Sequence, residues 1–127
     1  MIAVLFEVEP AAGQREAYLA EAAALRPRLE AIDGFLSIER FESLSSPGRI
    51  LSLSFFRDEA AVSAWRNDGS HRVAQARGRG GLFAGYRLRV AKVLRDYGLA
   101  ERNEAPPDSL RRFPGSTAGP ISRFEDG

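Results

Sequence analysis

The chain has 127 residues with a formal net charge of +1, and 44% of its residues are hydrophobic, which predicts one globular domain with a real core. It has no cysteine and one histidine, which excludes disulfides, zinc–thiolate sites, iron–sulfur clusters and multi-histidine metal sites, so no metal ligand is predicted. The balanced charge offers no field to attract nucleic acid or a membrane surface, and we expect neither as a partner.

The N-terminus also bears on location. Met1–Phe6 is apolar from the first residue and lacks the basic region and cleavage site of a signal peptide. No segment approaches the roughly 20 apolar residues that span a bilayer. We therefore expect a cytoplasmic protein whose first strand begins at the N-terminus.

A strand and a helix are predicted first. Apolar side chains alternate along Ile2–Val8, and Pro10 ends this strand. Apolar residues then recur at helical spacing, at Tyr18, Ala22, Leu25, Leu29 and Ile32. Pro27 lies inside this helix and predicts a kink or a loosened last turn, and Asp33-Gly34 ends it.

A hairpin and a second helix follow. Phe35–Leu44 and Ile50–Phe56 are predicted strands, joined by the turn residues Ser45–Gly48. Asp58 is a good N-cap for a short helix that carries Trp65.

The last predicted elements of the domain follow this helix. Ser70 could cap a further short helix from His71 to about Arg77. Arg77–Gly81 is expected to be a loop, and Tyr86–Tyr97 a long final strand.

The order strand, helix, strand, strand, helix, strand predicts an α+β fold, the ferredoxin-like split βαβ arrangement (βαββαβ) with an antiparallel sheet. Two helices cover only one face of such a sheet. The strands nevertheless carry apolar residues on both faces, for example Leu51, Leu53 and Phe55 against Ile50 and Phe56. A second copy of the chain is the commonest cover, so we expect a homodimer.

The domain is predicted to span residues 1–97, because the composition changes after them. Residues 98–127 are rich in proline and glycine and show no apolar periodicity. We expect an extended arm that packs on the dimer, with apolar anchors at Leu110, Phe113, Ile121 and Phe124. The alternative is a tail with no role in solution.

Several segments of the chain together resemble the antibiotic biosynthesis monooxygenase (ABM) domain, a family of dimeric α+β barrels. The matching segments are the N-terminal strand, Leu25-Arg26-Pro27, Ile32–Phe35, Leu53–Ala60, Ala64-Trp65-Arg66, His71-Arg72 and Tyr86–Val90. The resemblance covers roughly residues 1–97 and leaves the tail unexplained.

The resemblance implies a cofactor-independent monooxygenase that acts with molecular oxygen on a small electron-rich aromatic, such as a quinol or polyphenol. Such a substrate can itself pass an electron to oxygen, so the protein need only bind, deprotonate and desolvate it. One alternative is a haem-degrading monooxygenase, with haem as the bound group. Another is a non-catalytic dimeric barrel that binds a small ligand or is associated with stress.

Trp65 and His71 are the predicted catalytic residues. An indole can pack on a flat substrate, and the resemblance places Trp65 in the pocket; core packing alone is the alternative. His71 can move a proton or, in the haem-degrading branch, ligate iron. In that branch the histidine follows the tryptophan at a longer spacing than in this chain. The first strand of that branch also carries an asparagine, whereas the first strand of this chain has none. A surface position is the other interpretation of His71.

Tyr86, Arg87 and Arg89 are predicted to bind the substrate together with Trp65, by holding an enolate or phenolate oxygen. Arg87 and Arg89 share one face of the final strand with Arg95. These guanidinium groups could equally pair with glutamates of neighbouring strands, namely Glu7, Glu39 and Glu42.

Overall fold

The computed structural model describes residues 1–69, 71, 73, 76 and 78–115. The chain divides into two units, Met1–Lys92 and Val93–Gly127. The boundary lies five residues before the predicted one at residue 97. The elements, in order, are β1 Ile2–Pro10, α1 Arg15–Glu30, β2 Phe35–Glu42, β3 Ile50–Phe56, α2 Glu59–Arg66, a wide helical turn η1 Gly78–Leu82, β4 Phe83–Lys92 and α4 Pro107–Arg112.

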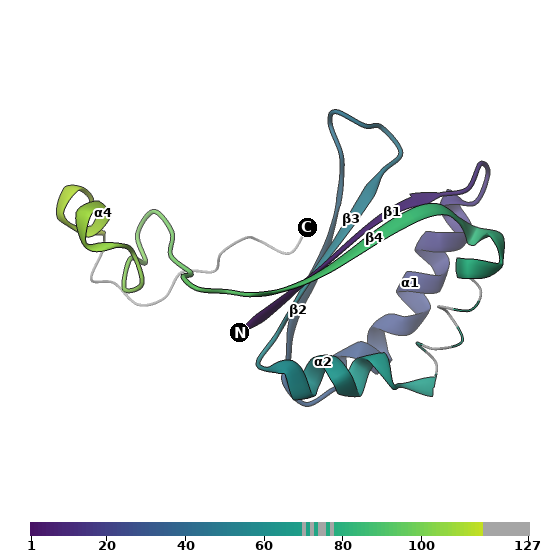
Figure 1. Cartoon of the computed structure of the whole chain (residues 1–127), viewed down its shortest axis with the longest axis horizontal. Coiled ribbons are helices and arrows are strands. Elements are labelled where there is room, and N and C mark those ends of the chain that lie inside the picture. Colours follow the sequence, from purple (N-terminus) through teal and green to yellow (C-terminus); the bar gives the residue numbers. More distant parts are fainter. Residues whose placement is uncertain (70, 72, 74–75, 77, 116–127) are drawn as a thin grey trace. The chain divides into compact units, whose positions relative to one another are not determined.

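The first unit has the predicted ferredoxin-like fold. Its antiparallel strands lie in the order β2-β3-β1-β4, and α1 and α2 lie on the same side of the sheet (Figure 1). The other side of the sheet has no helix among the described residues of this unit. The arrangement predicted from the alternation of strands and helices is therefore confirmed.

The final strand is shorter than Tyr86–Tyr97. It begins at Phe83, opposite Pro10, and ends at Lys92, opposite Ile2. Because β1 starts at Ile2, later residues have no strand to pair with, and the ladder stops there. Arg95 consequently lies in the second unit and does not share a strand face with Arg87 and Arg89.

The alternation along the strands decides which side chains face the helices. Even-numbered residues of β3 are buried, and this set includes Ile50, Ser52, Ser54 and Phe56. The odd-numbered leucines of β3 point to the uncovered face. Two core clusters lie on the helix side, one around Val8, Tyr18 and Ile50 and the other around Leu29, Phe56 and Ala61.

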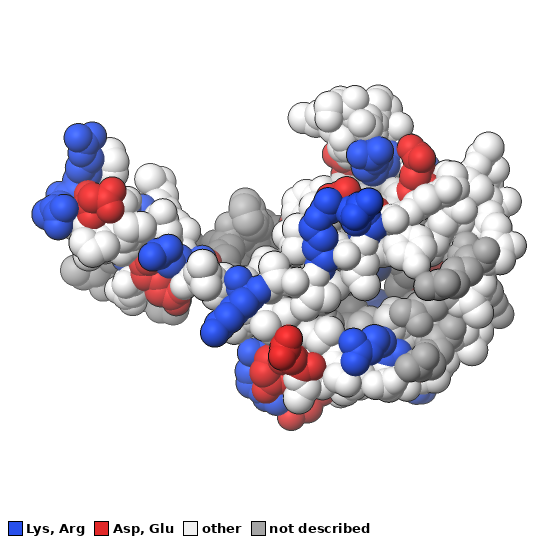
Figure 2. Space-filling model, viewed as in Figure 1, with Lys and Arg blue, Asp and Glu red and all other residues white. Residues whose placement is uncertain are grey.

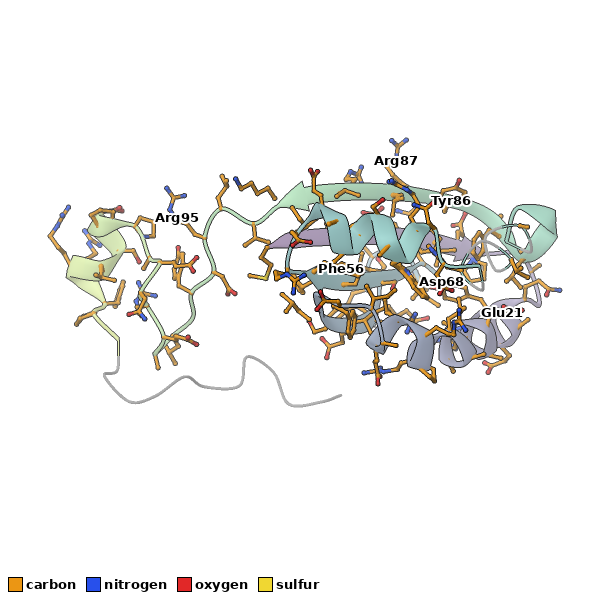
Figure 3. All side chains as sticks on the ribbon, turned by 90° about the horizontal axis from the view of Figure 1, so that it is seen from below. Glu21, Phe56, Asp68, Tyr86, Arg87 and Arg95 are labelled. Carbon is orange, nitrogen blue, oxygen red and sulfur yellow. The ribbon has the colours of Figure 1, made fainter. Side chains whose placement is uncertain are left out.

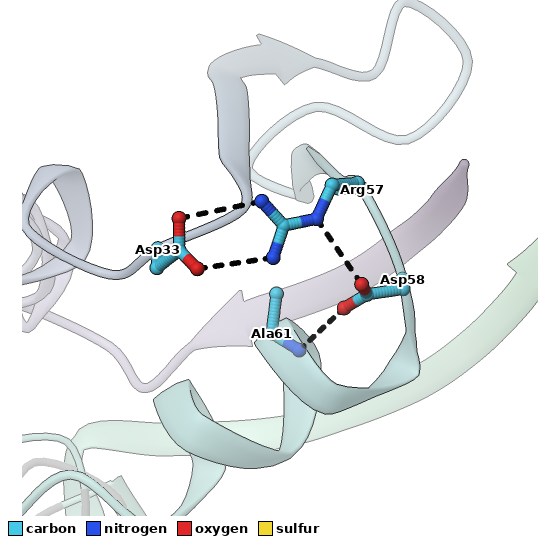
Figure 4. Close-up of polar contacts among 4 residues, drawn as sticks. All are labelled: Asp33, Arg57, Asp58 and Ala61. Carbon is cyan, nitrogen blue, oxygen red and sulfur yellow. Dashed lines mark hydrogen bonds and ion pairs between the residues drawn. The ribbon is translucent and has the colours of Figure 1, made fainter.

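An ion-pair network joins the start of β2 to the start of α2 (Figure 4). The Arg57 guanidinium donates to both carboxylate oxygens of Asp33, at 3.3 and 3.1 Å, and to Asp58 at 3.1 Å. Asp58 is the predicted N-cap and accepts from the Ala61 amide at 2.9 Å. That amide bond, and then Arg57, lower the pKa of Asp58, while Arg57 lowers the pKa of Asp33.

Asp58→Ala is expected to lower the melting temperature at pH 7, because it removes the cap of α2. The folded-state pKa of Asp58 lies below the usual 3.8, so its contribution is present above that value and is lost as the pH falls through the folded-state pKa. The difference in melting temperature between the variant and the parent should therefore shrink below about pH 4.

Asp58→Asn is the control for this experiment, since its side-chain oxygen can still cap the helix and only the charge is lost. A difference between Asp58→Ala and the parent that is the same at pH 7 and at low pH would contradict the assignment.

The second unit is organised around Arg102. Its guanidinium donates to the carbonyls of Gly98, at 3.0 Å, and Phe113, and it also bonds Ser109. It lies over the Tyr97 ring, 5.2 Å from the centroid.

The predicted anchors Leu110 and Phe113 are 37% and 63% exposed, and Ile121 and Phe124 lie outside the described residues. Docking of this segment on a dimer stays a prediction.

The surface shown in Figure 2 carries lysine and arginine interspersed with aspartate and glutamate, in keeping with the balanced charge. Across the part of the chain that the structure describes, the helices are too short or too polar to span a bilayer.

Candidate functional site

A cavity of about 340 Å³ lies between the sheet and the two helices. This volume falls within the range of small-molecule sites. Its wall is mostly apolar and includes Val4, Phe6, Tyr18, Leu25, Leu29, Ile38, Phe56, Val62, Leu82, Phe83, Leu88 and Val90. The polar side chains at the wall are Glu21, Arg26, Arg40, Ser52, Ser54, Trp65, Arg66, His71 and Tyr86.

Trp65 and His71 meet at this cavity. Their rings stack with centroids 4.4 Å apart and planes inclined by 12°. Trp65 lies on α2, and its ring also packs against the Leu29 and Phe56 cluster. Core packing and pocket lining, which the sequence left as alternatives, are therefore both true of this side chain.

His71 is held in one orientation by the chain around Trp65. Its Nδ1 lies 3.0 Å from the Trp65 carbonyl oxygen. Since a carbonyl only accepts, Nδ1 carries the proton in this bond. In the neutral ring the lone pair then belongs to Nε2, which makes Nε2 the atom that can take up a proton.

Asp68 fixes the backbone at the histidine. Its Oδ1 accepts from the His71 amide at 3.3 Å, and its Oδ2 accepts from Arg28 of α1 at 2.9 Å. The Asp68 carboxylate thus caps the backbone at His71, and the predicted cap, Ser70, lies outside the described residues. The described residues of the following stretch, His71, Val73 and Ala76, are helical, as the sequence predicted.

Tyr86 enters the cavity wall from β4 as part of an aromatic cluster. Its ring centroid lies 5.5 Å from that of Phe6 and 6.1 Å from that of Phe83. Phe83 in turn packs on Tyr18 of α1 at 5.7 Å. The Tyr86 ring therefore packs within an aromatic cluster, and its hydroxyl can donate or accept a hydrogen bond.

Arg87 and Arg89 do not line this cavity. They alternate with Tyr86, Leu88 and Val90, so they lie on the opposite face of the sheet, and Figure 3 shows Arg87 pointing away from α1. Arg89 donates to Glu7 of β1 at 3.1 Å, one of the glutamate pairings that the sequence left open. The structure brings Trp65, His71 and Tyr86 together without these two arginines.

Arg40, Ser52 and Ser54 are cavity residues that the sequence analysis did not select. The signal for the serines was present in β3, where they alternate with Leu51, Leu53 and Phe55. A strand that turns its serines toward its own helices and its leucines away inverts the usual pattern. On the helix side the cavity accounts for this inversion, because both serines line it.

No cluster of three or more histidine, cysteine or acidic side chains suited to a metal ion occurs among the residues that the structure describes.

Comparison with known proteins assigns the family. The profile of the family described as antibiotic biosynthesis monooxygenase matches residues 1–77. Jasmonate monooxygenase ABM from Pyricularia oryzae is 50% identical over 93 residues, 73% of this chain and 43% of that protein. The uncharacterized protein YqjZ from Bacillus subtilis is 33% identical over 60 residues, 47% of this chain and 51% of that protein. The chain thus aligns with only about half the length of these curated relatives.

Solved structures agree on the fold. Rv0793 from Mycobacterium tuberculosis superimposes with a TM-score of 0.68 at 22% identity, over 76% of this chain and 98% of that one. SO0527 from Shewanella oneidensis gives 0.65 at 20% identity, over 71% and 87%. These structures agree with the observed sheet order, and the profile match over residues 1–77 shows that the chain belongs to the antibiotic biosynthesis monooxygenase family.

Proposed function

We propose that this protein is a cofactor-independent monooxygenase whose substrate reacts with molecular oxygen inside the cavity of each subunit. The observation that carries the proposal is that a tryptophan and the chain's single histidine stack at the wall of one apolar cavity. A purely ligand-binding protein has no need for an oriented proton acceptor there.

Each cavity residue has a role in this proposal. The apolar wall excludes water, which protects a reactive carbanion or phenolate from protonation. Nε2 of His71 takes a proton from the substrate, because Nδ1 is held by the Trp65 carbonyl. Trp65 and Tyr86 flank the ring of the substrate, and the Tyr86 hydroxyl can donate to the oxygen on which charge develops.

The chemistry balances without an external electron donor when the substrate supplies all the electrons. An activated CH₂ group and one O₂ molecule give a carbonyl group and water, so one oxygen atom enters the substrate and the other leaves as water. Electron-rich quinols and polyphenols, once deprotonated, are the substrates that the sequence suggests. The relative named jasmonate monooxygenase adds a second class, because jasmonate is a cyclic ketone that carries a carboxylate.

The test is oxygen consumption by the purified protein with a panel of quinols, polyphenols and jasmonate, without added cofactor. The expected result is enzyme-dependent uptake, with incorporation of one atom of ¹⁸O per product molecule by mass spectrometry. Absence of uptake with every member of the panel, while the same compounds bind in the cavity, would favour the non-catalytic alternative.

Haem degradation is the alternative that the orientation of His71 also suits, since metal-ligating histidines commonly donate their other nitrogen to a carbonyl. Added haemin should then give a Soret band that His71→Ala abolishes. A protein that shows no such band is not a haem enzyme of this kind.

The homodimer belongs to the same proposal. The uncovered face of the sheet carries Ala3, Leu5, Leu51, Leu53 and Phe55, which no helix of the described first unit covers. The ion pair between Arg89 and Glu7 lies among them, so these two charges of the face are matched within the subunit. A second copy of this sheet is the occupant that we propose.

Leu53→Lys is expected to convert the dimer to a monomer at micromolar concentration, because it replaces an apolar contact of the proposed interface by a charged, hydrated side chain. Leu44→Lys is the control, since Leu44 is fully exposed in the connection between β2 and β3. Sedimentation velocity measures both. A parent protein that sediments as a monomer, or a Leu53→Lys variant that remains dimeric, would overturn the proposal.

A further inference from the structure

Arg40 of β2 is one of the polar side chains at the cavity wall. Its Nε is buried and donates to no acceptor among the residues that the structure describes. No ion pair to Arg40 occurs among those residues either. The other two arginines at the cavity wall differ, since Arg26 donates to Glu30 at 2.7 Å and Arg66 to Ser63 at 3.4 Å.

A buried N–H donor without an acceptor is costly, because the N–H loses its hydration without gaining a hydrogen bond. Folded proteins rarely keep such a group unless something meets it in the working state. An arginine is always charged and offers several N–H donors in a planar fork, which matches the two oxygens of a carboxylate. The unmet donor therefore indicates an anionic group on the molecule that fills the cavity.

The surroundings of Arg40 suit one carboxylate. Ser52 is the cross-strand partner of Arg40 on β3, and Ser54, the cross-strand partner of Ile38, lies one row further along the same face. Both serines are 7% exposed, and the rest of this floor is apolar, with Phe6 and Leu88 continuing the row of Arg40 and Ser52. One charged fork beside two small hydroxyls, on an otherwise apolar floor, fits a molecule with a single acidic end.

We propose that Arg40 binds the carboxylate of an otherwise apolar acid and so sets the orientation of the substrate under Trp65 and His71. This inference rests on the proposed function only in identifying the bound molecule as the substrate. It makes Arg40 a specificity residue for acids over their neutral esters, with Ser52 as the neighbouring hydroxyl donor.

The experiment measures binding rather than turnover. Trp65 is the chain's only tryptophan and lies at the cavity, so its fluorescence reports occupancy. Jasmonic acid and its methyl ester are titrated in parallel, and 4-phenylbutyrate and its methyl ester repeat the comparison on another skeleton. We expect each acid to bind about 10- to 100-fold more tightly than its ester.

Arg40→Gln should abolish this preference, whereas Arg49→Gln should retain it, because Arg49 is an exposed residue outside the cavity wall. Arg40→Lys keeps the charge without the fork and should retain only part of the preference. Arg40→Gln should also raise the melting temperature of the ligand-free protein, since it removes a buried N–H donor that has no acceptor; a purely structural arginine would give the opposite shift.

The outcomes separate the two proposals. Equal affinity for acid and ester in the parent protein, or an unchanged preference in Arg40→Gln, would overturn the role of Arg40 whether or not oxygen is consumed. Selective binding of acids without oxygen uptake would leave Arg40 as an anion site and reject the oxygenase.

Discussion

His71→Asn is expected to lower the rate of substrate oxygenation by about 100- to 10,000-fold, the usual contribution of a positioned proton acceptor. The asparagine amide can still donate to the Trp65 carbonyl, as Nδ1 of His71 does at 3.0 Å. It offers no basic nitrogen in place of Nε2. The loss should therefore appear in kcat with little change in KM, because the interaction is needed only in the transition state.

Trp65→Phe is the matched variant for this experiment. It keeps an aromatic ring next to the imidazole and the backbone carbonyl that orients it, so we expect less than about a tenfold loss if stacking and orientation are what Trp65 provides. A His71→Asn protein that is folded and retains a tenth or more of the parent rate would show that another group accepts the proton.

Much of the fold could be predicted because local signals agree with one another. The alternation in Ile2–Val8 and the cap at Asp58 each indicate the boundary that the structure shows. The first helix was predicted to end at Asp33-Gly34 but ends at Glu30, and Gly34 lies in the turn before β2. The boundary of β4 could not be predicted in this way. Residues after Lys92 continue an apolar pattern, and only the length of β1 on the neighbouring strand ends the ladder.

The candidate site was predictable only in part, because it is assembled from side chains of four strands and both helices. Spacing along one strand showed that Arg87 and Arg89 share a face, but not that the helices cover the other face. The tryptophan and histidine stood out because each occurs once in the chain. Arg40 is one of 18 cationic residues, and nothing local to its strand distinguishes it. Only its buried Nε, which has no acceptor among the described residues, does so.

Gly34→Ala is expected to lower the free energy of unfolding by about 2–4 kcal/mol, through strain and overpacking together. Gly34 has φ +92°, a left-handed conformation that costs an L-residue about 1–2 kcal/mol. A Cβ there would also lie 2.8 Å from the Cβ of Ala61, which is buried at the start of α2. Urea unfolding measures the loss.

Gly48→Ala separates the two contributions to that loss. Gly48 has nearly the same φ, +94°, but nothing lies within 4 Å of the place that a Cβ would take, so this variant should show the backbone cost alone. Adding Ala61→Gly to Gly34→Ala removes the clash and should restore part of the lost stability, even though glycine itself weakens α2 by about 1 kcal/mol. Equal losses in Gly34→Ala and Gly48→Ala would show that the loop before β2 does not pack against α2 as closely as this structure places it.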